Sequence, residues 1–177
     1  MSFRISRASV SLYDEANEVW WHAPEANLVL RRVAYGFALF ADASVASGDA
    51  PWRSEIVASY KAQTRTFSVS ARVFDLIPAD IAEDVFALSQ LAQVRLPLSG
   101  QAHVEFTRDG KMIAASAELN AAAGRVGFPD YISEPVLIDQ GKVRFDYEPS
   151  SGHIVMRDSL VWVGGQPTRL TGRRPSA

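Results

Sequence analysis

The residues of this sequence best suited to chemistry are its three histidines and a few carboxylates. His103 and Glu105 are two positions apart in a stretch that alternates polar and apolar residues, so a strand would place both side chains on one face. That is the minimum for binding a metal ion, but the sequence offers this pair no third ligand. Cysteine is absent, which excludes disulfide bonds and thiolate ligands. We therefore expect no metal site and no cofactor.

Asp14, Asp146 and Glu148 are the carboxylates that could work in pairs as general acid and base. They lie where alternating stretches end, and acidic residues in such places commonly turn the chain. The sequence has neither the Gly-x-Ser-x-Gly motif of a nucleophile elbow nor a glycine-rich phosphate loop. We therefore predict a protein that is not an enzyme and has no catalytic residues. A hydrolase that uses Asp146 or His153 is the least favoured alternative.

The adjacent residues Trp20 and Trp21 raise the question of a stacking platform for sugar rings. Neighbouring side chains on a strand point to opposite faces, so these two indoles cannot form one platform. We expect one of them to pack on the apolar face of a sheet and the other to cover an edge.

Composition excludes several classes of protein. The hydrophobic fraction is 47% and the charged fraction is 21%, values typical of a folded chain rather than a disordered one. The net charge of -2 provides no basic surface, so we predict no nucleic-acid partner. No run approaches the roughly 20 apolar residues that span a bilayer. The N-terminal segment alternates where a signal peptide would be continuously apolar.

Alternation of polar and apolar residues with a period of two, typical of half-buried strands, dominates the chain. It is clearest in residues 37–45, 67–73 and 113–123. Turn residues separate these stretches, for instance Asp109 and Gly110, a pair that favours a tight hairpin. The sequence therefore predicts a mainly β protein built from antiparallel strands.

One segment follows a helical pattern instead. Ile81, Val85 and Leu88 recur at intervals of three or four positions, and acidic residues occupy the first turns. We predict one amphipathic helix near 79–93 that packs on an end of the sheet. It divides the chain into a first sheet portion (1–76), a helical segment (77–95) and a second sheet portion (96–172).

Such a sheet is too large for one helix to cover. About nine or ten strands spaced about 4.8 Å apart would be roughly 45 Å wide, whereas a four-turn helix is only about 20 Å long and 10 Å wide. The sheet must close into a barrel, fold into a sandwich, or curve around an apolar partner. We predict the third arrangement, a long, curved antiparallel sheet that forms a partly open groove.

Small side chains mark the apolar side of one predicted strand. Ala115, Ala117, Ala121 and Ala123 stand where a two-layer core would usually contain Val, Ile or Leu. They leave room either for another protein layer or for a guest chain, and at this stage both remain open. We predict that an acyl-chain groove is lined by Phe37, Leu39, Ala41, Val69, Ala71, Val104, Ile113, Ala115, Ala117 and Leu119.

Several short motifs follow one another in order along nearly the whole chain. ASVSLYDEANEVWWH comes first, LPLSGQAHVEFTRDGKM follows the predicted helix, and AAAGRVGFPD and LVWVGGQPTRLTG come last. In this order the sequence resembles the AsmA-like superfamily of bacterial envelope proteins, nearest the YhdP-like branch with its domain of unknown function.

The resemblance implies a function as well as a fold. Members of this superfamily form long curved sheets with an apolar groove and are anchored in the inner membrane by an N-terminal helix. They extend through the periplasm and are implicated in moving phospholipids toward the outer membrane. By this likeness we expect a periplasmic segment of a longer repeat protein. Its partners would be a phospholipid or another acyl-chain lipid and the neighbouring segments of the same polypeptide.

Two further expectations concern partners. A strand at the edge of such a segment has unpaired backbone groups, so we expect edge-strand self-association, most of all through Arg4–Leu12. The main alternative to the groove is a closed β-barrel or sandwich that binds a small apolar ligand or a protein partner.

Overall fold

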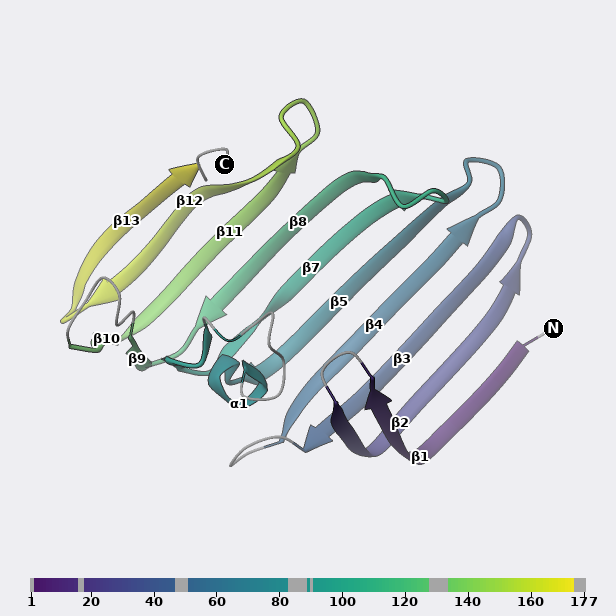
Figure 1. Ribbon diagram of the computed structural model, residues 1–177, viewed down its shortest axis with the longest axis horizontal. Coiled ribbons are helices and arrows are strands. Elements are labelled where there is room, and N and C mark those ends of the chain that lie inside the picture. Colours follow the sequence, from purple (N-terminus) through teal and green to yellow (C-terminus); the bar gives the residue numbers. More distant parts are fainter. Residues whose placement is uncertain are drawn as a thin grey trace.

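The computed structural model describes residues 2–15, 18–46, 51–82, 89, 91–127 and 134–173, most of which lie in strands. Ten strands form one open antiparallel sheet (Figure 1). In the order in which they lie side by side they are β1 (Ser2–Asp14), β2 (Val19–Val33), β3 (Gly36–Ala46), β4 (Trp52–Lys61), β5 (Thr66–Leu76), β7 (Leu98–Thr107), β8 (Met112–Ala121), β11 (Gln140–Glu148), β12 (His153–Val163) and β13 (Gln166–Arg173). The predicted antiparallel β fold is confirmed, and the closed barrel is wrong.

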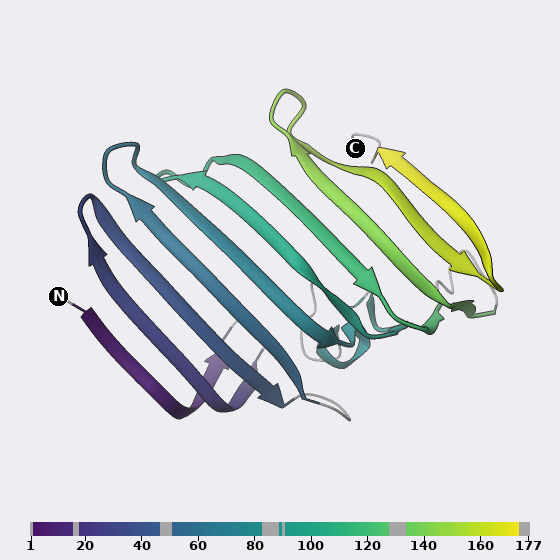
Figure 2. The ribbon, with the colours of Figure 1, turned by 180° about the vertical axis from the view of Figure 1, so that it is seen from behind.

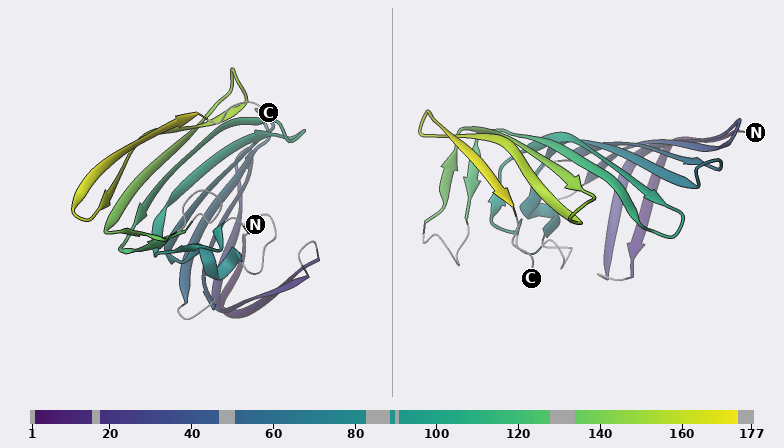
Figure 3. Two further views of the ribbon diagram at one scale, coloured as in Figure 1. Left: turned by 60° about the vertical axis from the view of Figure 1, so that its left-hand side comes forward. Right: turned by 90° about the horizontal axis from the view of Figure 1, so that it is seen from above.

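Two connections leave this large sheet and fold back over it. The connection from β5 to β7 holds α1 (Pro78–Ala82) and β6 (Val94–Arg95), and the one from β8 to β11 holds β9 (Gly124–Val126) and β10 (Val136–Ile138). The three short strands pair in the order β10-β9-β6 as a small antiparallel sheet, which we call the roof. Figure 3 shows α1 and the roof on the same side of the large sheet. In Figure 2, seen from behind, the described elements leave the other side uncovered.

The predicted helix is present at the beginning of the expected range. α1 spans Pro78–Ala82 and residues 83–88 lie outside the described part of the chain. The Ala92 N–H donates to the Ser89 carbonyl oxygen at 3.1 Å, an i→i+3 hydrogen bond of the 3₁₀ type shortly before β6. Of the residues expected to pack on the sheet, Ile81 is half-buried and the other two are outside the described residues. Within the described residues, no helix has the length and apolar character needed to cross a membrane.

The two sheet portions predicted on either side of the helix join directly. β5 pairs with β7, with Val69 opposite Val104 and Ala71 opposite Ala102, and the register shifts only beyond Val73. The segment that follows the helix therefore continues the sheet and does not begin a separate one.

β1 and β2 bend sharply near the middle of their hairpin. The register shifts between Ile5 and Val10 on β1 and around Pro24 on β2. Arg7 adopts a φ of 51°, and its N–H donates to Oδ1 of Asn27 at 2.9 Å. Bulges of this kind bend a strand and increase its twist. The part of the hairpin between these bulges and its turn is here called the arm and consists of Val10–Asp14 and Val19–Ala23. The arm turns toward the side of the large sheet that carries α1 and the roof (Figure 3).

The outer strand β1 supports a prediction about self-association. Phe3 and Ile5 leave 53% and 37% of their surface exposed, and β1 has one described neighbour in the sheet. We expect the mass measured by sedimentation velocity to rise with protein concentration, because free backbone groups on an edge pair with another strand. Ile5→Lys should suppress the rise, since an inward-pointing charge on an edge opposes pairing, and Arg4→Lys should not. A monomer at the highest concentration would contradict this expectation.

Candidate functional site

The strand register brings the predicted groove residues to one face of the large sheet. Residues directly opposite each other in antiparallel strands share a face. Leu39 is connected in this way to Val69 through Ala58, and Val69 continues to Val104 and then to Ala115. The other residues follow the same pattern, except that Ile113 lies in a register shift of the β7–β8 ladder. All the predicted residues except Ile113 are thus gathered on one face, which we call the inner face.

The inner face is the side on which the roof lies. Leu119 of β8 and Phe145 of β11 line a cavity together with Leu96, Val126 and other residues of the roof and its connections. Figure 3 shows the arm turned toward the same side. The apolar residues therefore face the hollow side of the molecule.

Side chains of different size form rows that cross the strands of the inner face. Tyr60, Phe67 and Phe106 form an aromatic row, with ring centroids 4.6 Å and 5.3 Å apart. Four positions along the strands, about 13 Å at about 3.3 Å per residue, a row of mostly small side chains runs parallel to it. That row consists of Ala41, Ile56, Ala71, Ala102 and Ala117.

The inner face is largely uncovered. Phe37 is 50% exposed and Ile56 is 37% exposed. Among the described residues, the buried apolar side chains are Pro78, Ala79, Ala82, Leu96 and Val155, and none of them belongs to the aromatic row or to the row of small side chains. All but Val155 lie in α1 or beside the roof. Contiguous exposed apolar surface is found at protein or membrane interaction sites, in ligand-binding grooves and on surfaces that aggregate.

One end of the inner face is covered by the roof, and there the two line a partly open cavity of about 460 Å³. Sequence reasoning assigned one residue of its lining, Leu119, to the groove, placed Ala121 among the small side chains of the same strand, and missed the others. Period-two alternation could have identified Val143 and Phe145, which continue the pattern on β11. The roof strands have two or three residues each, too few for a pattern to be visible. The missed lining residues are Val94, Leu96, Leu98, Val126, Val136, Ile138, Gly141, Val143, Phe145, Val161, Val163, Thr168 and Leu170.

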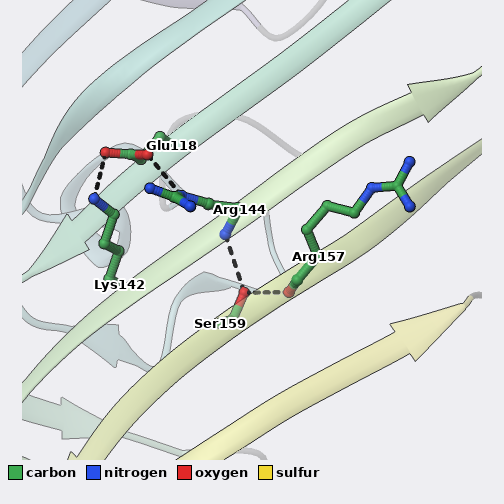
Figure 4. Close-up of polar contacts among 5 residues, drawn as sticks. All are labelled: Glu118, Lys142, Arg144, Arg157 and Ser159. Carbon is green, nitrogen blue, oxygen red and sulfur yellow. Dashed lines mark hydrogen bonds and ion pairs between the residues drawn. The ribbon is translucent and has the colours of Figure 1, made fainter.

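The opposite, outer face carries ion pairs between neighbouring strands. Glu118 on β8 binds two cations of β11, with its Oε1 2.7 Å from Nζ of Lys142 and its Oε2 2.7 Å from Nε of Arg144 (Figure 4). Asp146 accepts a hydrogen bond from Nε of Arg157 at 2.9 Å. The outer face is thus the more polar of the two, although Phe40 and Val57 also lie on it and are 43% and 44% exposed.

A buried hydroxyl stabilises the register shift between β11 and β12. Ser159, 1% exposed, accepts a hydrogen bond from the Arg144 N–H at 3.0 Å and donates one to the Arg157 carbonyl oxygen at 2.9 Å (Figure 4). It thus satisfies backbone groups at the place where the ladder is interrupted.

The Glu118 cluster gives an expected pH dependence. Hydrogen bonds from Lys142 and then from Arg144 lower the pKa of Glu118 below its ordinary value of 4.5. A carboxyl group whose pKa is lower in the folded state stabilises the protein above its unfolded pKa, and this contribution is lost as pH falls through the folded value. We expect Glu118→Gln to flatten the fall in unfolding free energy below pH 4.5, measured by urea denaturation at a series of pH values.

Lys142→Met removes the first cause of the shift and should flatten the same part of the curve. Curves that run parallel for the wild type and both variants would show that the pair contributes nothing to acid sensitivity.

Of the predicted catalytic and metal candidates, the structure brings His103 and Asp146 to one hollow of the outer face, which Glu118, Arg144 and Arg157 also line. His103 lies on the outer face, with its Nδ1 2.9 Å from the Ser70 hydroxyl and its Nε2 3.5 Å from Glu105. Ser70 is opposite His103 across neighbouring strands, where cross-strand polar pairs are ordinary. Across the residues that the structure describes, no group of three His, Cys, Asp or Glu side chains could hold a metal ion.

Glu148 and Asp146, two of the predicted catalytic carboxylates, accept hydrogen bonds from side chains near them in the chain or on the neighbouring strand. Glu148 accepts a hydrogen bond from the Ser151 hydroxyl in the β11–β12 turn at 2.8 Å, and His153 is exposed beside that turn. The side chain of Asp14 lies outside the described residues. Trp20 is 68% exposed and packs its ring 5.0 Å from that of Tyr13 on the arm.

The site is therefore defined by its geometry, an apolar inner face that the roof covers at one end. Comparisons of this chain with protein-family models, curated proteins and solved structures found no match.

Proposed function

We propose that the inner face binds the acyl chains of phospholipids and lets them move across the strands, as a non-enzymatic segment of a lipid-transfer protein. The observation that carries this proposal is the apolar inner face, which the described residues leave uncovered over most of the strands. Phe37 and Ile56 remain 50% and 37% exposed there, although one face of a large sheet is normally buried. An acyl chain is the partner whose surface matches a long apolar row.

The row of small side chains offers weak contacts along which a lipid acyl chain can move. Ala71, Ala102 and Ala117 place methyl groups on three successive strands, so a lipid chain that lies along the row crosses them at intervals of about 4.8 Å. A fully buried methylene contributes about 0.8 kcal/mol, and one covered on a single side contributes about half of that. Contacts of this size are weak one by one, and none is directional, so the chain can shift along the row.

The outer face supports the same proposal. Its ion pairs, such as Glu118 with Arg144, keep the far side of the sheet compatible with water. A sheet that is polar outside and apolar inside can shield hydrocarbon in an aqueous compartment. The resemblance to AsmA-like proteins favours the periplasm as that compartment, with an anchor in the inner membrane supplied by a part of the polypeptide outside this chain.

Photo-crosslinking tests the proposal. The purified chain is incubated with vesicles that contain a phospholipid with a diazirine on one acyl chain, irradiated, and mapped by mass spectrometry. We expect labels on Leu39 and Ala41 and not on Phe40 and Asp42, because these neighbours alternate between the inner and outer faces. The same protein in concentrated urea serves as the control for unspecific labelling. Equal labelling of both faces, or no labelling at all, would refute the proposal.

A further inference from the structure

We infer that the cavity below the roof holds the terminal segment of one acyl chain, at the place where the row of small side chains ends, and that the lipid headgroup stays outside it. This inference rests on the proposed function, because it assigns a fixed binding position to the same inner face. Ala71, Ala102 and Ala117 offer the same contact on three successive strands, so the open row holds a lipid at no particular strand. The roofed end can hold one in place.

The row of small side chains leads directly to the cavity. Ala102 on β7 is opposite Ala117 on β8, and Ala117 is opposite Phe145 on β11. Phe145 lines the cavity, and so does Leu119, the next residue after Ala117 on the inner side of β8. The ring of Phe145 ends the row of small side chains. An acyl chain that follows the row therefore reaches the lining of the cavity at this strand.

The cavity lies between two apolar layers. Val126 of β9 pairs with Val94 on one side and with Val136 on the other, and all three line the cavity from the roof. Leu137, the residue after Val136, points away from the cavity and is 70% exposed. The large sheet supplies the other layer through residues of β7, β8, β11, β12 and β13. A chain in this space is therefore covered from both sides.

The two layers face each other without filling the space between them. Among the apolar side chains that line the cavity, Leu96 alone is buried in the described structure, whereas Phe145 is half-buried and Leu170 is 37% exposed. Layers that pack together as a protein core bury the side chains between them and leave few voids larger than a water molecule. The volume of about 460 Å³ falls instead in the range of about 300–1,000 Å³ that is typical of ligand sites.

The roof is held above the large sheet by close packing. A Cβ on Gly124 would lie 2.3 Å from Cβ of Leu96, so the backbone of β9 rests directly against that residue. Leu96 is only 3% exposed. The close approach fixes the height of the roof, so the space beneath it is part of the fold.

The lining admits hydrocarbon and excludes the headgroup. Among the described residues that form it, none is charged, and Thr168 is the one with a polar side chain. A phospholipid headgroup carries charge, and burying a charge without a partner is costly. A peptide segment would likewise leave its backbone N–H and C=O groups without partners. An acyl chain has no such groups, so it enters by its methyl end while the headgroup stays on the open side.

Cover on both sides should make binding tighter here than on the open row. A methylene covered on both sides gains about twice the contact of one covered on one side, and each fully buried methylene is worth about a fourfold change in affinity. The lipid is therefore expected to stay longer at the roofed end than elsewhere on the inner face.

The test uses the purified chain, vesicles of phosphatidylcholine and two photoreactive probes. One probe is phosphatidylcholine with a diazirine at the methyl end of one acyl chain, and the other carries the diazirine beside the ester. We expect the first probe to label the open inner face and also residues below the roof, such as Leu119 and Val126. The second probe should label the open face as strongly and the residues below the roof about tenfold less, because the ester stays outside with the headgroup.

Two variants fill the cavity from its two sides. Ala121→Phe adds a ring from the large sheet, and Ile138→Trp adds one from the roof. Each should reduce the labels of the first probe below the roof by about tenfold, since displacing two buried methylenes has an effect of that size, and should leave the open face labelled. Asn120→Phe and Leu137→Trp add the same rings on the exposed sides of the same strands and should change neither set of labels.

Circular dichroism of each variant shows whether the sheet is intact. If Ala121→Phe disrupts β8, Ile138→Trp still gives the answer, because β10 lies outside the large sheet.

The outcomes separate this inference from the proposed function. Labels on the open face with none below the roof would overturn the inference and leave the proposed function in place, and so would equal labelling below the roof by both probes. Labels only below the roof would support the cavity as a lipid site and refute movement along the open face. The absence of both sets would refute both.

Discussion

Ala117→Asp is expected to reduce lipid labelling of the inner face by about tenfold while the sheet remains folded. Ala117 lies in the row of small side chains, opposite Ala102 on β7 and Phe145 on β11. An aspartate at the centre of a hydrocarbon layer costs about 2.5–3.5 kcal/mol. The inner face is open on one side, so we expect about half of that penalty, roughly 1.4 kcal/mol, which is a factor of about ten in affinity.

Ser116→Asp is the matched control for this variant. Ser116 is the preceding residue and points to the outer face, opposite His103. The same charge at this position meets water and polar side chains, so labelling should stay within about twofold of the wild type. The crosslinking is read alongside circular dichroism of both variants. Equal loss of labelling in both folded variants would mean that the inner face is not the surface that contacts lipid.

Gly100→Ala should lower the free energy of unfolding by about 3 kcal/mol, the largest effect on stability that we expect from adding one methyl group. A Cβ at this position would lie 2.2 Å from the carbonyl oxygen of Glu118 and 2.9 Å from Cα of Leu119. Both are backbone atoms of β8, so the methyl group can be accommodated only if β7 and β8 move apart. Urea denaturation monitored by tryptophan fluorescence measures the change.

Gly141→Ala provides the comparison, because Gly141 also lies on the inner face. Its added Cβ would lie 3.4 Å from Cγ2 of Val161 and 3.5 Å from Cβ of Ala121, ordinary contact distances. We expect this variant to be as stable as the wild type or more stable by about 0.5 kcal/mol, since alanine restricts the unfolded chain. If both variants were equally stable, the β7–β8 pair would be less tightly packed than described.

The inner face could be predicted from sequence because it depends on a local pattern. Alternation at Ala115, Ala117 and Leu119 fixes which side of one strand is apolar. The tight turn at Asp109 and Gly110 is equally local, and it is confirmed by a φ of 84° at Gly110 and a hydrogen bond of 3.0 Å from its N–H to the Thr107 carbonyl oxygen. A short turn also sets the register of the two strands that it joins, so their apolar side chains lie on the same face of the sheet.

The features that sequence reasoning missed depend on contacts between distant residues. Val94 and Val126 belong to strands too short to show alternation, and they form strands because they pair with each other. The bend of the arm depends on the hydrogen bond between Arg7 and Asn27, which lie on different strands.

The strand order of the large sheet has a consequence for how such a protein can change in evolution. Each strand lies beside the strands nearest to it in the chain, and α1 and the roof are inserted without taking a place in the order. The duplication or loss of one hairpin would therefore leave all other strand pairs intact and change the width of the sheet by about 10 Å. A hairpin contributes two strands, so the following strands keep their direction. The sheet can thus be widened or narrowed in hairpin-sized steps, while its other dimension, set by strand length, stays constant.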